Sequence, residues 1–314
     1  MDAVAYALAS QLKLGGDSWA QKSDMPTGRY GLGVAAINGI IYAVGGYKPG
    51  TGLYSGENES YDPKTDTWTT KASMPSPRLG LAVAVANNRL FAINGRVSSA
   101  VSVVEEYDPV ENRWYGKNAC PISGDGSRAT VCNGYIYLIG GGGGGGKYNY
   151  QYDPNTDTWV QKADMPTSRY YLGVESIDGK VYACGGYSTQ VGGGSYVVHN
   201  EMYDPNTNTW TTKAAMTQQR GYFASGTIDG ELYAAGGTSG GANHLTHVEK
   251  YNPSKNFWIR LVDTPVGRKY TAGAVIGKKL YVVGGEQHSL NRIDEYSAIS
   301  IQGLDTLLGY LAAN

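Results

Sequence analysis

The six tryptophans of this chain recur at a nearly constant spacing. Consecutive tryptophans stand 45 to 51 residues apart, and the segments between them repeat the same local patterns in the same order. A period of this length indicates one supersecondary unit copied along the chain, because such a unit buries its apolar faces only by stacking on its neighbours. The six positions are Trp19, Trp68, Trp114, Trp159, Trp210 and Trp258.

Each repeat predicts four antiparallel strands. In the first repeat the apolar run 33–37 is followed by Asn38-Gly39, a dipeptide that tolerates two positive φ angles and closes a two-residue hairpin. A second apolar run, 40–44, ends at a Gly-Gly pair, and a third strand ends at the Tyr-Asp-Pro turn of residues 61–63. The fourth strand carries the tryptophan. Since one such sheet cannot cover both of its faces, six of them are expected to pack as blades around an axis.

These motifs together resemble the kelch family of β-propellers. The resemblance rests on the Gly-Gly pair, the Tyr-Asp-Pro turn with its downstream Trp, the acidic residue before that Tyr, and Met-Pro before an Arg. It covers residues 17–297. It implies an all-β, six-bladed propeller with four antiparallel strands per blade, and counting the hairpins leads to the same number.

The ends of the repeat array predict how the ring closes. The last repeat has no Trp strand after it, whereas the chain begins with an unpaired one at Trp19. Pairing the Trp19 strand with the C-terminal blade would complete that blade and remove both free sheet edges. The alternative is that residues 297–302 supply the outer strand.

Two segments lie outside the predicted propeller. Residues 1–16 are expected to form a short helix, and residues 298–314 are an apolar tail with leucines near helical spacing. The tail either folds back on the propeller or docks on another subunit, so a homo- or hetero-oligomer formed through residues 1–16 and 298–314 stays open. The N-terminal segment also resembles short attachment segments of phage tail or tailocin receptor-binding proteins.

Composition excludes several classes of function. The net charge is −1, so the basic surface of a nucleic-acid or anionic-membrane binder is not expected. No stretch is long and apolar enough to span a bilayer, and residues 1–16 lack the pattern of a secretory signal. We expect synthesis in the cytoplasm and leave a particle-borne or released state open. Three cysteines are expected to be buried small hydrophobic residues; they are Cys120, Cys132 and Cys184.

An arginine near the start of each repeat is predicted to be structural. An acidic residue stands two positions before the repeat Tyr in five blades, and Tyr150 takes its place in blade 3. Each Arg is expected to pair with that carboxylate and with loop carbonyls, which leaves Arg128 without an acid and free to recognise an anionic ligand. The arginines are Arg29, Arg78, Arg128, Arg169, Arg220 and Arg268, and the acids are Glu59, Glu105, Glu201, Glu249 and Asp294.

The variable residues predict a binding face. Strand direction places the loops after the Gly-Gly pairs and the loops before each Arg on one side, here called the upper face. Its longest post-glycine loops are 47–58, 187–200 and 238–248. Tyrosines gather in the contiguous blades 4, 5, 6 and 1, together with histidines, a composition typical of adaptable binding surfaces. The candidate ligand-binding residues are Tyr30, Tyr170, Tyr171, Tyr187, Tyr222, Tyr270, His199, His247 and Arg128.

Two further patterns bear on possible cofactor sites. His244, His247 and His288 could form a metal site, but exposed loop histidines are the favoured interpretation, so neither a metal nor another cofactor is expected. The run 140–146 before Lys147 is similar to a phosphate loop, yet no Ser or Thr follows the Lys and a strand comes next. It is therefore expected to be a plain loop.

Three functions follow as hypotheses. The first is a non-enzymatic recognition module whose upper face binds a glycan or a protein surface. The second is a receptor-binding or structural component of a larger assembly such as a phage tail, docked by its apolar ends. The third comes from the family resemblance, since some kelch proteins are copper oxidases of sugars and others interconvert sugar anomers or epimers. Cys184 lies just before a structural Gly pair, which is a poor place for the Cys–Tyr crosslink of the oxidases.

Overall fold

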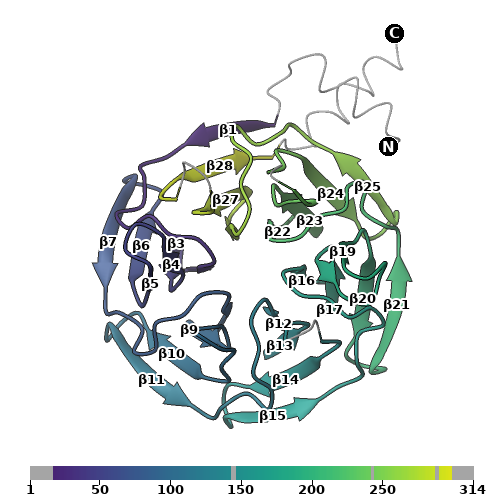
Figure 1. Cartoon of the computed structure of the whole chain (residues 1–314), viewed down its shortest axis with the longest axis horizontal. Coiled ribbons are helices and arrows are strands. Elements are labelled where there is room, and N and C mark those ends of the chain that lie inside the picture. The colour runs from purple at the N-terminus through teal and green to yellow at the C-terminus, as the bar shows by residue number, and fades with distance from the viewer. Residues whose placement is uncertain (1–16, 143–145, 242–243, 287–289, 299–314) are drawn as a thin grey trace.

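The computed structural model of the protein describes residues 17–142, 146–241, 244–286 and 290–298. Within these residues the chain forms six four-stranded antiparallel sheets, which Figure 1 shows arranged as blades around a central axis. In each blade the innermost strand lines the axis and the outermost strand carries the repeated tryptophan. The predicted fold, an all-β six-bladed propeller, is confirmed.

In the first five blades the strands follow chain order from the inside to the outside, and in blade 6 the N-terminal strand takes the outermost place. The first three blades consist of β2 (Gly33–Ile37), β3 (Ile40–Val44), β6 (Asn58–Asp62) and β7 (Thr67–Lys71); of β8 (Ala82–Ala86), β9 (Arg89–Ile93), β10 (Val104–Asp108) and β11 (Arg113–Lys117); and of β12 (Arg128–Cys132), β13 (Tyr135–Ile139), β14 (Asn149–Asp153) and β15 (Thr158–Gln161). The last three consist of β16 (Gly173–Ile177), β17 (Lys180–Cys184), β20 (Asn200–Asp204) and β21 (Thr209–Lys213); of β22 (Ala224–Ile228), β23 (Glu231–Ala235), β24 (Val248–Asn252) and β25 (Phe257–Arg260); and of β26 (Ala272–Ile276), β27 (Lys279–Val283), β28 (Ile293–Ser297) and β1 (Ser18–Gln21).

The ring closes through its N-terminal strand. β1 pairs antiparallel with β28, with Trp19 opposite Tyr296, and completes blade 6 as predicted. The alternative, in which residues 297–302 supply the outer strand, is wrong because β1 occupies the place beside β28. Residues 1–16 and 299–314 lie outside the described residues, so the short helix and the docking of the tail remain predictions.

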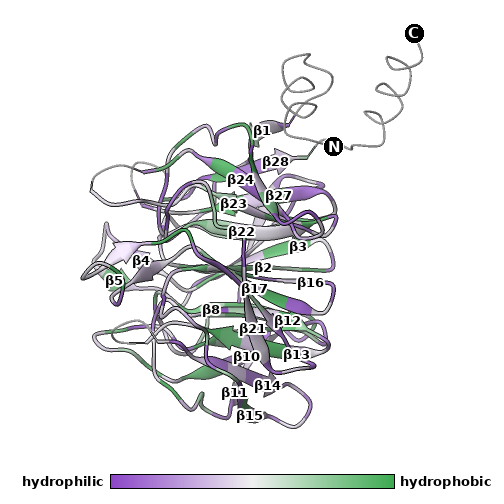
Figure 2. Ribbon diagram, turned by 90° about the vertical axis from the view of Figure 1, so that its right-hand side faces the viewer, coloured by the Kyte–Doolittle hydropathy of each residue, from purple (hydrophilic) through white to green (hydrophobic). Residues whose placement is uncertain are grey.

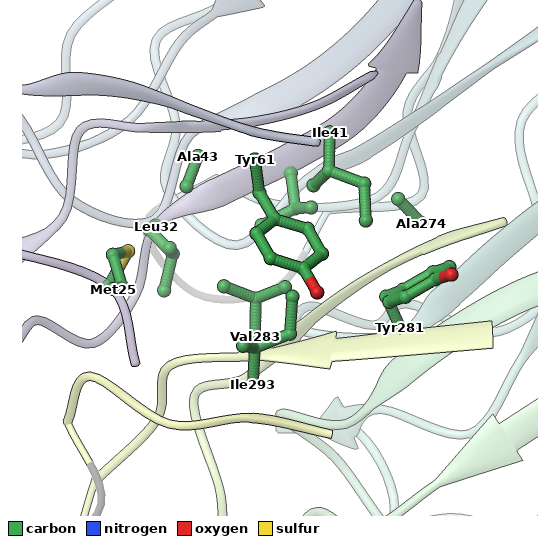
Figure 3. Close-up of a cluster of buried hydrophobic side chains, with 10 residues drawn as sticks. Met25, Leu32, Ile41, Ala43, Tyr61, Ala274, Tyr281, Val283 and Ile293 are labelled. Carbon is green, nitrogen blue, oxygen red and sulfur yellow. The ribbon is translucent and has the colours of Figure 1, made fainter. Parts of the chain in front are cut away.

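The core is divided among the contacts between neighbouring blades. Among the described residues, one apolar cluster lies at each of the six blade-to-blade interfaces. Figure 3 shows the interface that closes the ring, where Tyr61 and Ile41 of blade 1 pack against Tyr281 and Val283 of blade 6. The three cysteines are buried and free, as predicted.

The repeated tryptophans join each blade to the one before it. In every blade the indole N–H donates to a backbone carbonyl that follows the outer strand of the preceding blade. Trp68 donates to Ser23 O at 2.7 Å and Trp19, in the closing blade, to Val262 O at 3.3 Å. The same type of contact therefore runs around the whole ring, the closing blade included. The other donors are Trp114, Trp159, Trp210 and Trp258.

Five blades hold a buried arginine–carboxylate pair in the described residues, as predicted. In blade 5, Arg220 Nη2 lies 2.9 Å from Glu249 Oε1, and its Nη1 donates to the carbonyls of Gly236 and His247. The guanidinium thus ties the upper loops to the strands, and the carboxylate offsets the charge that is buried. The pairs are Arg29–Glu59, Arg78–Glu105, Arg169–Glu201, Arg220–Glu249 and Arg268–Asp294.

Candidate functional site

The upper face is built by a repeated backbone contact. In blades 1 and 4 the residue after the repeated Arg forms an antiparallel bridge with the residue that follows the Gly-Gly pair, and blades 2, 5 and 6 contain the same bridge. The loops before each Arg and after each Gly-Gly pair therefore share one face, as strand direction predicts. The bridges are Tyr30 with Tyr47, Leu79 with Arg96, Tyr170 with Tyr187, Gly221 with Thr238 and Lys269 with Glu286.

Two of the long upper loops form hairpins on opposite blades. In blade 1, β4 (Tyr47–Lys48) pairs with β5 (Leu53–Tyr54), and in blade 4, β18 (Tyr187–Ser188) pairs with β19 (Ser195–Tyr196). β4 and β19 lie on opposite sides of the axis in Figure 1, and β4 and β5 project at the left of Figure 2. The hairpins thus stand across the axis from one another.

Each hairpin carries two tyrosines and holds a third, from the loop after the repeated Arg, against them. In blade 1 the ring of Tyr47 lies 5.4 Å from that of Tyr30 and 5.5 Å from that of Tyr54. In blade 4 the ring of Tyr187 lies 5.3 Å from Tyr170 and 5.1 Å from Tyr196. Tilted and edge-to-face contacts at these distances are favourable for aromatic rings.

Three more tyrosines connect these sets across the channel mouth. The ring centroids of Tyr171 and Tyr222 are 4.0 Å apart, and those of Tyr222 and Tyr270 are 4.2 Å apart. Tyr270 also contacts Tyr30, and Tyr171 contacts Tyr170. We call the nine residues the tyrosine cluster: Tyr30, Tyr47, Tyr54, Tyr170, Tyr171, Tyr187, Tyr196, Tyr222 and Tyr270.

The three central tyrosines have an unusual backbone. Tyr171, Tyr222 and Tyr270 have φ angles of 52°, 59° and 57°, in the left-handed region. The equivalent positions of blades 1, 2 and 3 are glycines, which adopt such angles without the steric penalty of a Cβ atom. Each tyrosine therefore costs on the order of 1 kcal/mol that glycine would avoid. The equivalent glycines are Gly31, Gly80 and Gly126.

Burial raises the pKa of several hydroxyl groups in the tyrosine cluster above the ordinary value for tyrosine. It raises the pKa of Tyr196 to about 12, and it also raises the pKa values of Tyr171 and Tyr222. The Tyr171 hydroxyl donates to Asp125 Oδ2 at 2.9 Å, and only 5% of Tyr171 is exposed. Tyr222 and Tyr270 are half-buried. The cluster therefore offers ring faces and neutral hydroxyls.

The prediction that Arg128 belongs to the series of repeated arginines is wrong. Arg128 is the first residue of inner strand β12, whereas in the other blades the Arg stands four residues before that strand. Gly124 occupies the Arg position, since its carbonyl accepts from Gly95 N just as the carbonyl of Arg78 accepts from Gly46 N. Tyr150 does stand at the acid position, so blade 3 lacks both members of the pair.

A sequence signal for this correction exists. In the other blades the Arg lies four residues after the Met or Thr of the Met-Pro slot, and in blade 3 that slot is Cys120-Pro121. Arg128 instead lies on the inner strand, near the upper end of the central channel. Its guanidinium carbon lies 5.7 Å from the centre of the Tyr171 ring, and Nη1 donates to Ser127 O at 3.1 Å.

The candidate histidines have structural contacts through their backbones. The carbonyl of His199 accepts from Arg169 at 3.0 Å, and that of His247 accepts from Arg220 at 2.6 Å. Burial lowers the pKa of His247. Within the described part of the chain, no group of three or more His, Cys, Asp or Glu side chains could hold a metal ion. His288 lies outside it, so the three-histidine site stays a hypothesis.

Sequence reasoning missed one residue of the central channel. Glu175, in the middle of inner strand β16, lines a cavity of about 350 Å³ on the axis. Ser225 Oγ donates to Glu175 Oε1 at 2.7 Å, and burial raises the pKa of this carboxyl group to about 7. The signal was present, because the other inner strands carry Ala, Thr or Gly at that position. These residues are Ala35, Ala84, Thr130, Gly226 and Ala274.

Comparison with known proteins identifies relatives of this chain. It is 30% identical over 206 residues to Kelch-like protein 25 of Xenopus tropicalis, covering 62% of this chain and 34% of the relative. It is 28% identical over 239 residues to Kelch-like protein 36 of Rattus norvegicus, covering 71% and 38%. The chain thus spans about a third of the length of these curated relatives. No helix in the described residues is long and apolar enough to cross a membrane.

A solved structure and a family motif complete the comparison. The structure titled "Structure of YjhT" superposes with a TM-score of 0.73 at 16% identity, covering 88% of this chain and 95% of that one, which shows the fold alone. The Kelch motif matches residues 28–75, 77–116, 125–166, 168–217 and 219–265. The kelch propeller is a type of protein-binding module. With the motif matched over most of its length, this chain belongs to the kelch family.

Proposed function

We propose that this protein is a non-enzymatic recognition module whose tyrosine cluster binds an exposed segment of a partner protein. The observation that carries the proposal is the placement of Tyr171, Tyr222 and Tyr270 at positive φ angles where blades 1 to 3 use glycine. Strain of this kind persists where the side chain has a task, and here the rings cover the channel mouth on the upper face. The repeat itself does not require tyrosine at these positions.

The arrangement of the rings supports an extended ligand. Ring contacts run without interruption from Tyr54 in blade 1 to Tyr196 in blade 4. A ligand that uses the whole cluster must therefore cross the axis, as a polypeptide loop or strand can. Tyrosine gives a large contact area at a low cost in side-chain entropy, and its hydroxyl adds a hydrogen bond. Leu53, at 58% exposure, adds an apolar contact on the blade 1 hairpin.

The other candidate residues take lesser roles in this proposal. Tyr187 belongs to the blade 4 set, while Arg128 lies beneath Tyr171 and supports the cluster from the channel side. His199 and His247 would contribute indirectly, because their backbone carbonyls bind the repeated arginines and so fix the position of the upper loops. A glycan is the alternative ligand, since tyrosine faces also stack on sugar rings. Membership of a larger assembly and a sugar-modifying activity are the further alternatives, the latter with Glu175 as its titratable group.

The test is a binding screen of the full chain against a displayed peptide library and a glycan array. We expect peptides to be enriched and the double variant Tyr222→Ala/Tyr270→Ala to bind them at least about tenfold more weakly, because truncating an interface tyrosine typically costs about 2 kcal/mol. Its melting transition should stay close to that of the wild type. The matched control is Tyr135→Ala, a tyrosine that is 38% exposed at the start of β13 on the other face.

The outcomes separate the alternatives. Binding to glycans alone, lost in the same double variant and insensitive to a chelator, would keep the recognition role and change the ligand class. Peptide binding that survives the double variant but falls in Tyr135→Ala would contradict the assignment of the upper face. Loss of folding in the double variant would show that the two rings are part of the core.

A further inference from the structure

The central channel has two halves of different chemistry. The inner strands of blades 6, 1 and 2 read AGAVI, GVAAI and AVAVA, so that wall is entirely aliphatic. The inner strands of blades 3, 4 and 5 read RATVC, GVESI and ASGTI. The cavity of about 350 Å³ between them is thus amphipathic. The polar side chains that line the cavity are Thr130, Glu175, Ser176, Ser225 and Thr227.

Among the residues that the structure describes, Glu175 has no cationic partner. Its one hydrogen bond in the described residues comes from Ser225 Oγ, at 2.7 Å. An ionised carboxylate in this partly aliphatic cavity is poorly solvated. A second hydrogen-bond donor that carries positive charge would offset the cost of that lost solvation. Thr227 lies one strand position below the level of Glu175. Its Oγ1 is buried without a hydrogen-bond partner in the described residues, so it offers a ligand in the cavity a further polar group.

Arg128 does not fill this role. It starts β12, at the register of Gly173 and so two residues above the level of Glu175, and its guanidinium lies beneath the Tyr171 ring. The described residues contain no ion pair between the two side chains. Tyr171 and Tyr222 cover the upper end of the channel, whereas the cavity reaches residues near the lower ends of the inner strands, such as Ala36 and Val85. A ligand would therefore enter from the lower face.

We propose that the central channel binds a small organic ammonium ion. Its charged nitrogen would donate to Glu175 and contact Ser225, and its hydrocarbon part would pack on the aliphatic wall formed by β26, β2 and β8. The cavity volume is in the range of small-molecule sites. The site is separate from the tyrosine cluster and goes beyond the recognition role proposed above.

The experiment titrates cyclohexylammonium chloride into the full chain at pH 7.5 by calorimetry, with neutral cyclohexanol as the shape-matched control. We expect the ammonium ion to bind at least about tenfold more tightly than the alcohol, the effect of one charge-assisted hydrogen bond. Glu175→Gln should reduce its affinity to that of the alcohol. Arg128→Gln should strengthen it, because a like charge has been removed from the same channel.

Two more variants and a pH series test the site further. If Glu175→Gln does not fold, Ser225→Ala replaces it and should weaken the ammonium complex while leaving the charge in place. Affinity should also rise from pH 6 to pH 8 as Glu175 ionises. The Tyr222→Ala/Tyr270→Ala variant should bind the ion unchanged. Loss of binding in that variant would mean that the cation sits on tyrosine faces, and equal binding of ion and alcohol would also overturn the proposal.

Discussion

Three tyrosines and one glutamate stand where the other blades carry glycine, alanine or threonine. Tyr171, Tyr222 and Tyr270 replace glycine at a left-handed backbone position, and Glu175 interrupts a ring of small side chains on the axis. The repeated residues have the opposite character: the tryptophans and the arginine–carboxylate pairs are bonded to neighbouring strands and loops. The residues of the two proposed binding sites thus depart from the repeat, whereas the residues that follow the repeat hold the propeller together.

Glu175 makes stability depend on pH. Its pKa is about 7 in the folded protein, above the ordinary value of 4.5 that applies to the unfolded chain. The folded state thus binds the proton more tightly, so this contribution is fully present below pH 4.5 and is lost as the pH rises through 7. A glutamine side chain does not titrate, so Glu175→Gln should not lose stability as the pH rises. At pH 8 its free energy of unfolding should therefore gain at most about 3 kcal/mol on that of the wild type. Urea unfolding at pH 4.5, 6 and 8 measures it, and parallel pH profiles for the two proteins would contradict it.

The outer strands connect neighbouring blades of the ring. Each carries one tryptophan whose ring packs on the Tyr of the neighbouring strand and whose N–H reaches the preceding blade. In blade 3 the Trp159 ring lies 4.7 Å from Tyr152, and its N–H donates to Asn118 O after blade 2. In β15 the positions other than Trp159 are exposed, so Trp159 is the one side chain of this strand that packs on the blade.

We expect Trp159→Ala to lower the free energy of unfolding by about 3–5 kcal/mol, because it leaves a cavity at the interface of blades 2 and 3. The matched control is Val160→Ala, the next residue of the same strand, which is 50% exposed and should cost under about 1 kcal/mol. Chemical denaturation of both variants measures the difference. Equal losses would show that β15 is held by its backbone pairing alone.

The whole molecule depends on the single pairing of β1 with β28. Without β1, β28 would present an unpaired edge and the Trp19 contact to Val262 would be missing. Deleting residues 1–22 should therefore cost more than about 3 kcal/mol and promote association through the exposed edge. Deleting only residues 1–16 is the control and should leave the unfolding midpoint unchanged. Thermal unfolding with light scattering checks both, and two identical curves would refute the closure argument.

The sequence predicted the blades, the closure and five of the six arginine sites, because each of these is encoded by a local pattern that recurs. It failed at Arg128, where counting arginines was a poorer guide than the four-residue spacing from the Met-Pro slot. The contacts between Tyr171, Tyr222 and Tyr270 join different blades, so only their common face could be predicted. The surroundings of Glu175 depend on Ser225 in the next blade, about 50 residues away, which no local pattern specifies.

The closing pair also sets an order of events during synthesis. Trp19 and Tyr296 face each other although they lie roughly 280 residues apart in the chain, among the least local contacts of the fold. At about 5–20 residues per second, β28 leaves the ribosome some tens of seconds after β1. The intermediate blades can stack in the meantime, each on the one before it. Of the strands of the ring, the first to be made is thus the last to find its partner, and the propeller remains an open arc until blade 6 has emerged.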